Sequence, residues 1–254
     1  MDVHPGPEEP SVLTEQMSHR SQVIWAGQVL PDLQCRRSEA VFRRADAPDD
    51  RILQYIRQMG FYGAYRLGFI QYDWGLITAL VERWRVETHT FHLPIGETTI
   101  TLQDVGILLG LPVDGLPVTG IDESRSREEW QALCQELLGF SPPQQFLDGS
   151  RLRLTAIRDH FTAQLPQDAD DVTIRQMARC YCMMLIGGSL FPDKSGNKVS
   201  LLYLPHLRHF DAGYSWGSAA LACLYRALCV ATRPSSVQIG GPFILLQVIC
   251  YAYV

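Results

Sequence analysis

The chain has 254 residues, of which 46% are hydrophobic and 10% aromatic, so it can bury a core as one large domain or two small ones. Its net charge of -5 argues against nucleic acid or an anionic membrane as the main partner, because the whole chain has no positive field. Lys194 and Lys198 are the only lysines, which excludes most candidates for lysine chemistry.

The first 47 residues differ in composition from the rest of the chain. Residues 1–47 carry proline, glycine and charge without a sustained apolar period, which favours an extended N-terminal arm. One short helix is expected within this arm, near the stretch QVIWAG. Residues 48–254 show regular apolar patterns, so we expect them to form the folded domain.

Two amphipathic helices are predicted at the start of this domain. The first begins at Asp50 and ends before Gly60, a residue that readily takes the left-handed conformation after a helix. Its apolar positions at helical spacing are Ile52, Ile56 and Met59. The second has Asp73 as its N-cap, and its apolar stripe comprises Leu76, Ile77, Leu80, Val81 and Trp84. The two stripes should pack together.

Residues 88–102 predict a β-hairpin. The stretch THTFHL consists mostly of β-formers, PIGE is typical of a turn, and TTITL alternates again. In an extended strand, His89 and His92 would point to opposite faces and could not bind one ion together. We therefore interpret the segment as a structural hairpin. A metal site is the alternative, and it would require a helix through these residues.

Two further helix starts are marked by capping residues. Thr101 and Asp104 stand at the spacing of a helix N-terminus, and Ser126 with Glu129 forms a capping box. The predicted stops are Gly110 and Gly139. The apolar stripe of the second of these helices comprises Trp130, Leu133, Cys134, Leu137 and Leu138.

Three helices are predicted in the second half of the chain. LTAIRDHFTAQLP repeats apolar residues at helical spacing, at Leu154, Ile157, Phe161 and Leu165. A stronger helix covers residues 172–186, with Asp170 or Asp171 as its cap and Gly187-Gly188 as its end. The last begins at Ser215 and is apolar nearly all round, so we expect it at the centre of the domain. Its small residues, Gly217 among them, would let neighbouring helices approach closely.

The candidate catalytic motifs are weak. Gly187-Gly188 and DKSGNK lack the glycine spacing of a phosphate-binding loop, and Ser195 with Lys198 satisfies S-x-x-K without the further motifs of that enzyme class. A pyridoxal phosphate enzyme needs a desolvated lysine, whereas Lys194 and Lys198 lie in a polar segment typical of a turn. We therefore assign no catalytic, cofactor-binding or metal-ligating residue.

Arginines form pairs near the N-terminus. Arg36-Arg37 and Arg43-Arg44, with Arg20 upstream, make the arm locally basic and could serve nuclear import or contact a phosphate backbone. Solvated or partner-facing charge is the interpretation that we favour.

The cysteines and the chain ends indicate a reduced, intracellular protein. Seven cysteines without a C-x-x-C pattern fall mostly at apolar positions, as expected of buried thiols and not of a disulfide framework. The acidic, proline-rich start MDVHPGPEEP does not resemble a secretory signal. The apolar tract IGGPFILLQVICYAYV is interrupted and too short to span a bilayer, so we expect it in the core; a short membrane-inserting tail is the alternative.

Three long stretches resemble one protein family. They are LITALVERWRVETHTFHLPIGETTITLQDVGILLGLPVDGLPVTG at 76–120, LIGGSLFPDKSGNKVSLLYLPHLRHFDAGYSWGSAALACLYRALC at 185–229 and HPGPEEPSVLTEQMSHRSQVIWAG at 4–27. The first two resemble the plant mobile domain, also labelled aminotransferase-like, of maintenance-of-meristems proteins and plant transposable elements. The third resembles the arm of serine/threonine-protein phosphatase 7 long form homologues.

The resemblance implies a mostly helical domain of nuclear proteins connected with transposon silencing, genome stability and meristem maintenance. Some members act in complex with a phosphatase-7-like protein, and the family offers no catalytic residues to carry over.

This sequence departs from the pattern of the family in two ways. The family domain usually continues beyond GGP-x-x-LLQ, so we expect a C-terminally truncated or alternatively spliced member. The chain also lacks the G-D-x-H-G, G-D-x-x-D-R-G and G-N-H-E elements of a metallophosphatase, so phosphatase activity is not expected.

Taken together, we expect a mainly α, multi-helix domain with one small β-hairpin that binds a protein partner in the nucleus without catalysis, cofactor or membrane. One alternative is a transposon-derived nucleic-acid accessory domain, which needs a basic stripe and should bind less tightly as salt rises. The other is a pyridoxal phosphate-dependent enzyme, as the family label suggests.

Overall fold

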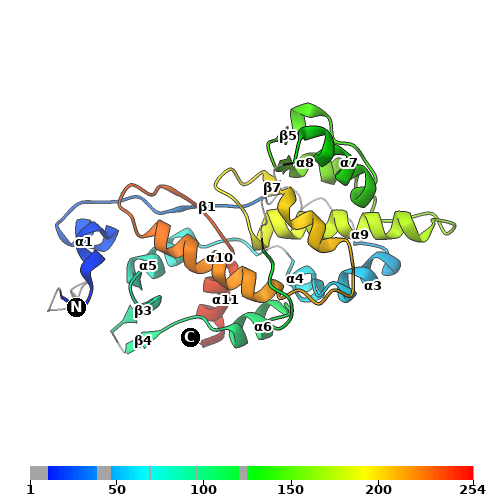
Figure 1. The fold of residues 1–254 in the computed structure, drawn as a ribbon. Helices are drawn as coiled ribbons and strands as arrows, with labels where there is room; N and C mark the ends of the chain where they lie inside the picture. The colour runs from blue at the N-terminus through cyan, green and yellow to red at the C-terminus, as the bar shows by residue number, and fades with distance from the viewer. Residues whose placement is uncertain (1–10, 39–46, 69, 95, 120–124, 254) are drawn as a thin grey trace.

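The computed structural model describes residues 11–38, 47–68, 70–94, 96–119 and 125–253, with the backbone alone over 251–253. Figure 1 shows a mainly α protein in which α10 and α11 lie in the middle, α1 lies at one end, and α7, α8 and α9 lie at the other. The predicted fold class is therefore confirmed. Within the described residues, every helix is too short or too polar to cross a membrane.

The first half of the chain contains five α-helices in its described part, and their starts follow local capping chemistry. They are α1 (Arg20–Trp25), α3 (Asp50–Gln58), α4 (Tyr62–Leu67), α5 (Trp74–Arg83) and α6 (Leu102–Leu109). The predicted caps of α5 and α6 are confirmed: the Asp73 carboxylate accepts from the Leu76 N–H, and Thr101 with Asp104 forms a full capping box. The short α4 had no clear signal in the sequence.

The second half contains α7 (Arg127–Leu138), α8 (Leu154–His160), α9 (Asp171–Leu185), α10 (Trp216–Ala231) and α11 (Ile244–Tyr253). The capping box of Ser126 and Glu129 begins α7, and the Asp170 carboxylate caps α9, as predicted. The C-terminal tract was expected in the core, and Ile244, Leu245 and Leu246 are indeed buried.

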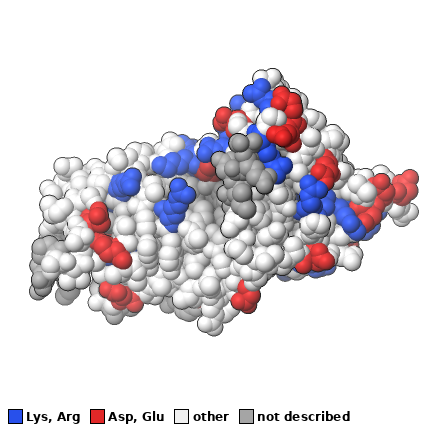
Figure 2. All heavy atoms as spheres, viewed as in Figure 1, with Lys and Arg blue, Asp and Glu red and all other residues white. Residues whose placement is uncertain are grey.

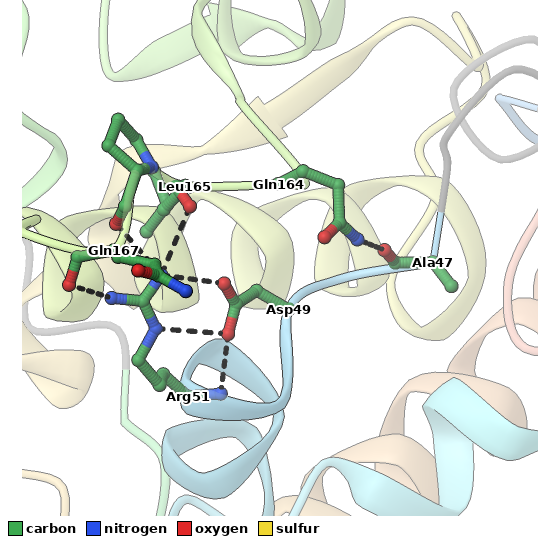
Figure 3. A network of polar contacts seen from close by, with 7 residues as sticks. Ala47, Asp49, Arg51, Gln164, Leu165 and Gln167 are labelled. Atoms are coloured by element: carbon green, nitrogen blue, oxygen red, sulfur yellow. Dashed lines mark hydrogen bonds and ion pairs between the residues drawn. The ribbon is translucent and has the colours of Figure 1, made fainter.

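Helix α8 is shorter than predicted because tertiary contacts hold the chain that follows it. The backbone becomes extended at Phe161. Arg51 of α3 then donates to the carbonyl oxygens of Leu165, Pro166 and Gln167 at 3.1, 3.0 and 3.3 Å, while its guanidinium also bonds Asp49 (Figure 3). These bonds replace the last predicted turn of α8 and tie the start of α3 to the segment before α9.

Helix α9 ends at Leu185, next to the predicted bound, but the two glycines do not end the helical course of the chain. They lie in a π-helical turn over Ile186–Leu190 that follows α9 directly. A Cβ at Gly187 would lie 2.5 Å from Val199 Cβ, so glycine here permits close packing against a neighbouring strand and does not stop the helix.

Helix α10 lies in the middle of the molecule, as predicted (Figure 1), although one of its faces is open to solvent. Trp216, Leu224 and Leu228 are buried, whereas Ala222 and Arg226 are exposed. The predicted close approach at Gly217 is confirmed, because a Cβ there would lie 2.8 Å from Val113 Cγ1 and 2.9 Å from the Pro112 carbonyl oxygen.

Three small sheets accompany the helices in the described part of the chain. The predicted hairpin is present as β3 (Thr90–Leu93) and β4 (Gly96–Thr98), and β2 (Trp84–Arg85) adds to it in the antiparallel order β2-β3-β4. A second antiparallel sheet contains β5 (Leu147–Asp148), β6 (Arg151–Arg153) and β7 (Lys198–Ser200). The third pairs β1 (Gln34–Arg36) in parallel with β8 (Gln238–Gly240). The second and third sheets were not predicted, since their strands have only two or three residues each and, apart from the neighbouring β5 and β6, the paired strands are far apart in sequence.

The N-terminal segment packs against the rest of the protein. Its expected short helix is α1, and Leu33 and Cys35 contribute to the hydrophobic core. Arg20 was expected to carry solvated or partner-facing charge, but it is buried, and its Nε lies 3.3 Å from Glu82 Oε1 of α5. Arg43-Arg44 lie outside the described residues, and the division into an arm and a domain stays a prediction.

A candidate interaction groove

A groove of about 460 Å³ opens where β3, β4 and α6 meet α5 and α11. In Figure 1 these elements come together at the lower edge of the molecule. The residues that line it come from segments far apart in the chain: Leu80, Phe91, Leu93, Gly96, Glu97, Thr98, Thr99, Ile100, Asp104, Leu246, Ile249 and Cys250.

The groove has an apolar floor and apolar walls. Phe91, Ile100 and Leu246 form the floor, and their exposed fractions are 4%, 2% and 1%. Leu93 and Ile249 are half-buried and stand at the walls. An open apolar groove of this kind is typical of a site that binds an apolar ligand or segment, because covering it removes further apolar surface from water.

Consecutive residues from Gly96 to Ile100 all line the groove. Gly96–Thr98 make up β4, so the groove lies against the whole length of this strand. This strand is the last in the order β2-β3-β4, and none of the strands in the described part of the chain pairs with its outer edge.

The hairpin is fixed from behind by aromatic packing and hydrogen bonds. The Trp84 ring centroid lies 4.8 Å from that of Phe91 and 5.1 Å from that of Tyr225 of α10. The Tyr225 hydroxyl donates to the carbonyl oxygen of Ile100 at 2.6 Å and lies 2.8 Å from Thr99 Oγ1. Because these contacts hold both β3 and the residues after β4, the groove is formed before any partner arrives.

The opposite wall depends on the buried side chain of Gln247 in α11. Its Oε1 accepts a 3.0 Å bond from the Asp73 N–H, and its Nε2 donates a 2.8 Å bond to the carbonyl oxygen of Gln71. One amide thus joins α11 to the cap of α5.

The two carboxylates of the lining already have structural partners. Glu97 Oε1 lies 2.8 Å from His92 Nε2, and its side chain is 54% exposed at the rim. Asp104 Oδ2 accepts from the Thr101 N–H at 2.8 Å within the capping box of α6. Burial raises the pKa of the Cys250 thiol, which disfavours a thiolate. The described lining thus contains no nucleophile next to a general base.

The two hairpin histidines have different neighbours. His92 lies in β3 and pairs with Glu97 across the strands. His89 was predicted in the strand, but it precedes β3 with a φ of +53° and its ring stacks on Tyr225 at a centroid distance of 5.6 Å. The bend at His89 lets the chain turn from β2 into β3. Among the described residues, His, Cys, Asp and Glu side chains nowhere form a group of three suited to a metal ion.

The residues weighed as catalytic candidates lie away from the groove, around β7 (Figure 1). Ser195 sits in the predicted turn, where its N–H donates to Asp193 Oδ1 at 3.0 Å. Lys198 Nζ lies 2.7 Å from Asp148 Oδ2, and Lys194 is exposed to solvent. Neither lysine is in the desolvated surroundings that a Schiff-base lysine needs.

The groove was not predicted from the sequence. The alternation of residues 88–102 indicated the hairpin, and the C-terminal tract indicated a buried segment, but neither pattern indicates that Leu93 and Ile249 line the same groove. Two sequence features together could have pointed to the groove. One is the apolar face of the hairpin, and the other is a C-terminal tract with more apolar residues than one helix face can bury.

Comparison with known proteins agrees with the stretches quoted above. The family model described as plant mobile domain matches residues 60–254. Among Arabidopsis thaliana proteins, the serine/threonine-protein phosphatase 7 long form homolog is 48% identical over 97% of this chain and 18% of its own length. Protein MAIN-LIKE 1 is 40% identical over 100% of this chain and 49% of its length. Protein MAINTENANCE OF MERISTEMS is 39% identical over 95% of this chain and 50% of its length.

The chain thus spans half or less of the length of these relatives. No solved structure matches it. The family match covers most of the chain, and the similarity to full-length relatives extends over nearly all of it. The chain therefore belongs to the plant mobile domain family.

Proposed function

We propose that this chain is a non-catalytic interaction domain whose groove binds an extended segment of a partner protein. The observation that carries the proposal is the open apolar groove that lies against β4, the last strand of its sheet. An added strand would hydrogen-bond to the outer edge of β4, and its alternate side chains would enter the groove. Such a segment gains affinity from main-chain bonds and specificity from the few side chains that the groove accepts.

The lining defines the chemistry of this segment. The floor of Phe91, Ile100 and Leu246 suits aliphatic or aromatic side chains. Glu97 is the exposed charge at the rim, so a basic residue of the partner next to the apolar ones would be favoured. The expected ligand is therefore an extended segment in which apolar residues alternate, with one Lys or Arg beside them.

We take the partner to be a phosphatase-7-like protein. The name of the relative with 48% identity, serine/threonine-protein phosphatase 7 long form homolog, supports this choice. We place the interaction in the nucleus, in transposon silencing, genome stability and meristem maintenance. The name of the relative MAINTENANCE OF MERISTEMS supports the meristem part.

The test is affinity purification of the tagged chain from plant nuclei. The Leu93→Arg variant places a charge in the wall of the groove, while the Ile107→Arg control places the same charge on the exposed face of α6, where Ile107 is 71% exposed. We expect a phosphatase-7-like protein to co-purify with the wild type and the control and to be lost from Leu93→Arg, provided that circular dichroism shows all three folded. Equal recovery by the two variants would contradict the proposal.

A further inference from the structure

The outer face of the β5-β6-β7 sheet carries a local excess of positive charge. The strand register places Asp148 opposite Arg151, and Arg153 opposite Lys198, while Leu152 is buried on the other face. The alternation of side chains therefore puts Arg151, Arg153 and Lys198 together on the solvent side.

Two more cations adjoin this face. The turn after Asp193 carries the exposed Lys194, and Gly196 of the same turn packs against β1, since a Cβ on it would lie 3.5 Å from Arg36 Cβ. We call these five residues the basic strip: Arg36, Arg151, Arg153, Lys194 and Lys198. Figure 2 shows Lys and Arg atoms gathered along the upper margin of the molecule, over β1 and the neighbouring turn, with few Asp or Glu atoms among them.

The nearby carboxylates do not neutralise the strip. Asp148 Oδ2 lies 2.7 Å from Lys198 Nζ, and Asp193 Oδ2 lies 3.7 Å from Arg151 Nη1. Arg153 stands directly opposite Lys198 on the neighbouring strand, and like charges in that position repel each other. The strip is thus positive although the whole chain has a net charge of -5, so an anionic partner would relieve a repulsion that folding leaves in place.

The strands and the turn that carry the basic strip contain no aromatic side chains, and this bears on which class of anion the strip suits. Proteins that bind single-stranded nucleic acid stack the bases on aromatic side chains. Strands β1, β6 and β7 and the turn at 193–198 contain no Phe, Tyr or Trp. Arginine and lysine without aromatic residues suit the regularly spaced phosphates of a duplex, which they can neutralise without contacting the bases.

We propose that the basic strip binds the phosphate backbone of duplex nucleic acid without reading its sequence. The site is separate from the groove, so it does not depend on the proposed protein partner. Its affinity should fall steeply with salt, because bound phosphates release their counterions. If about four phosphates are neutralised, the affinity falls about a hundredfold between 50 and 200 mM salt.

The test is fluorescence anisotropy of the full chain with a labelled DNA duplex over this salt range. The double variant Arg151→Ala/Arg153→Ala should weaken binding at least about tenfold at low salt and lower the salt slope by about two. The control Arg57→Ala/Arg66→Ala removes the same charge from α3 and α4, where both side chains are exposed, and should change affinity less than about twofold. The variant Arg151→Lys/Arg153→Lys should keep the slope of the wild type.

Several outcomes would overturn the inference. These are a lack of duplex binding by the wild type at 50 mM salt, an equal loss of affinity in both alanine variants, tighter binding of a single strand of equal length, or preferential displacement of the duplex by poly-glutamate. The variant Arg151→Lys/Arg153→Lys keeps both positive charges. If it remains folded but fails to bind the duplex, charge alone does not explain the phosphate contact and the proposal is wrong.

Discussion

The Tyr225 hydroxyl of α10 lies 2.8 Å from Thr99 Oγ1 and donates a 2.6 Å hydrogen bond to the neighbouring Ile100 carbonyl oxygen. This contact attaches the base of the hairpin to the helix behind it. Replacing Tyr225 by Phe would leave both oxygens without this partner in a half-buried place. We expect Tyr225→Phe to lower the free energy of unfolding by about 1–2 kcal/mol, measured by urea denaturation.

Tyr214→Phe is the matched control for this substitution. Tyr214 packs against Trp216 through its ring, and its hydroxyl makes no hydrogen bond within the described residues. Its removal should change stability by less than about 0.5 kcal/mol. A similar loss in both variants would show that the Tyr225 hydroxyl does not hold the hairpin.

His19 should make the stability of the protein depend on pH. Burial lowers the pKa of His19 from 6.5 to about 4, while its ring contacts Ser21 and the Trp84 carbonyl oxygen. Between these two pKa values the unfolded chain binds a proton that the folded chain does not, so stability falls as the pH drops through this window. From pH 7 to pH 5 the loss from this group is about 2 kcal/mol.

The measurement is urea denaturation of the wild type and of His19→Asn at both pH values. Asparagine keeps an oxygen that can cap α1 but does not titrate. We expect the difference in stability between the two proteins to narrow at pH 5. A constant difference would mean that His19 is not the titrating group.

Gly217 and Gly106 should respond in opposite directions to alanine. A Cβ at Gly217 would meet Val113 and the Pro112 carbonyl oxygen at less than 3 Å, so Gly217→Ala should destabilise the fold by about 1–3 kcal/mol. A Cβ at Gly106 in α6 would lie 3.5 Å from Val113 Cγ1, which is an ordinary contact. Gly106→Ala should therefore stabilise the helix by about 0.5–1 kcal/mol. Thermal unfolding of the pair measures both, and stabilisation by both substitutions would contradict the close approach of α10 to residues 112–113.

The thiols should be largely unreactive in the folded protein. All seven cysteines are free, and four of them are buried: Cys35, Cys134, Cys180 and Cys182. Burial raises the pKa of Cys35 and of Cys134 to about 12, and it raises those of Cys180 and Cys182 as well. With Ellman's reagent at pH 8, at most three thiols should react quickly before denaturant is added, and seven afterwards. Rapid reaction of more than three would show that the core opens readily.

The helices were predictable where the chain signals its own ends over a few residues. Asp73, Asp170 and the pairs Thr101–Asp104 and Ser126–Glu129 each bond a backbone N–H within three residues, so the sequence shows the whole interaction. The hairpin was predictable for the same reason, because alternation and the turn are local patterns.

The remaining features depend on contacts between distant segments. Arg20 belongs to a basic-looking segment, yet it is buried because Glu82 of α5 lies beside it. Phe161 continues an apolar helical period, yet the helix stops there because Arg51 holds the residues that follow. The groove and the basic strip likewise arise only when separate strands and helices meet, and neither was predicted from the sequence.

Amide hydrogen exchange, followed by mass spectrometry, tests the central claim most directly. The full chain is measured alone and with a purified phosphatase-7-like protein. A strand added to the edge of β4 would engage its free backbone N–H groups, so we predict slower exchange at residues 96–100 and unchanged exchange in α7. Protection confined to other surfaces, with residues 96–100 exchanging as fast as in the chain alone, would contradict the account.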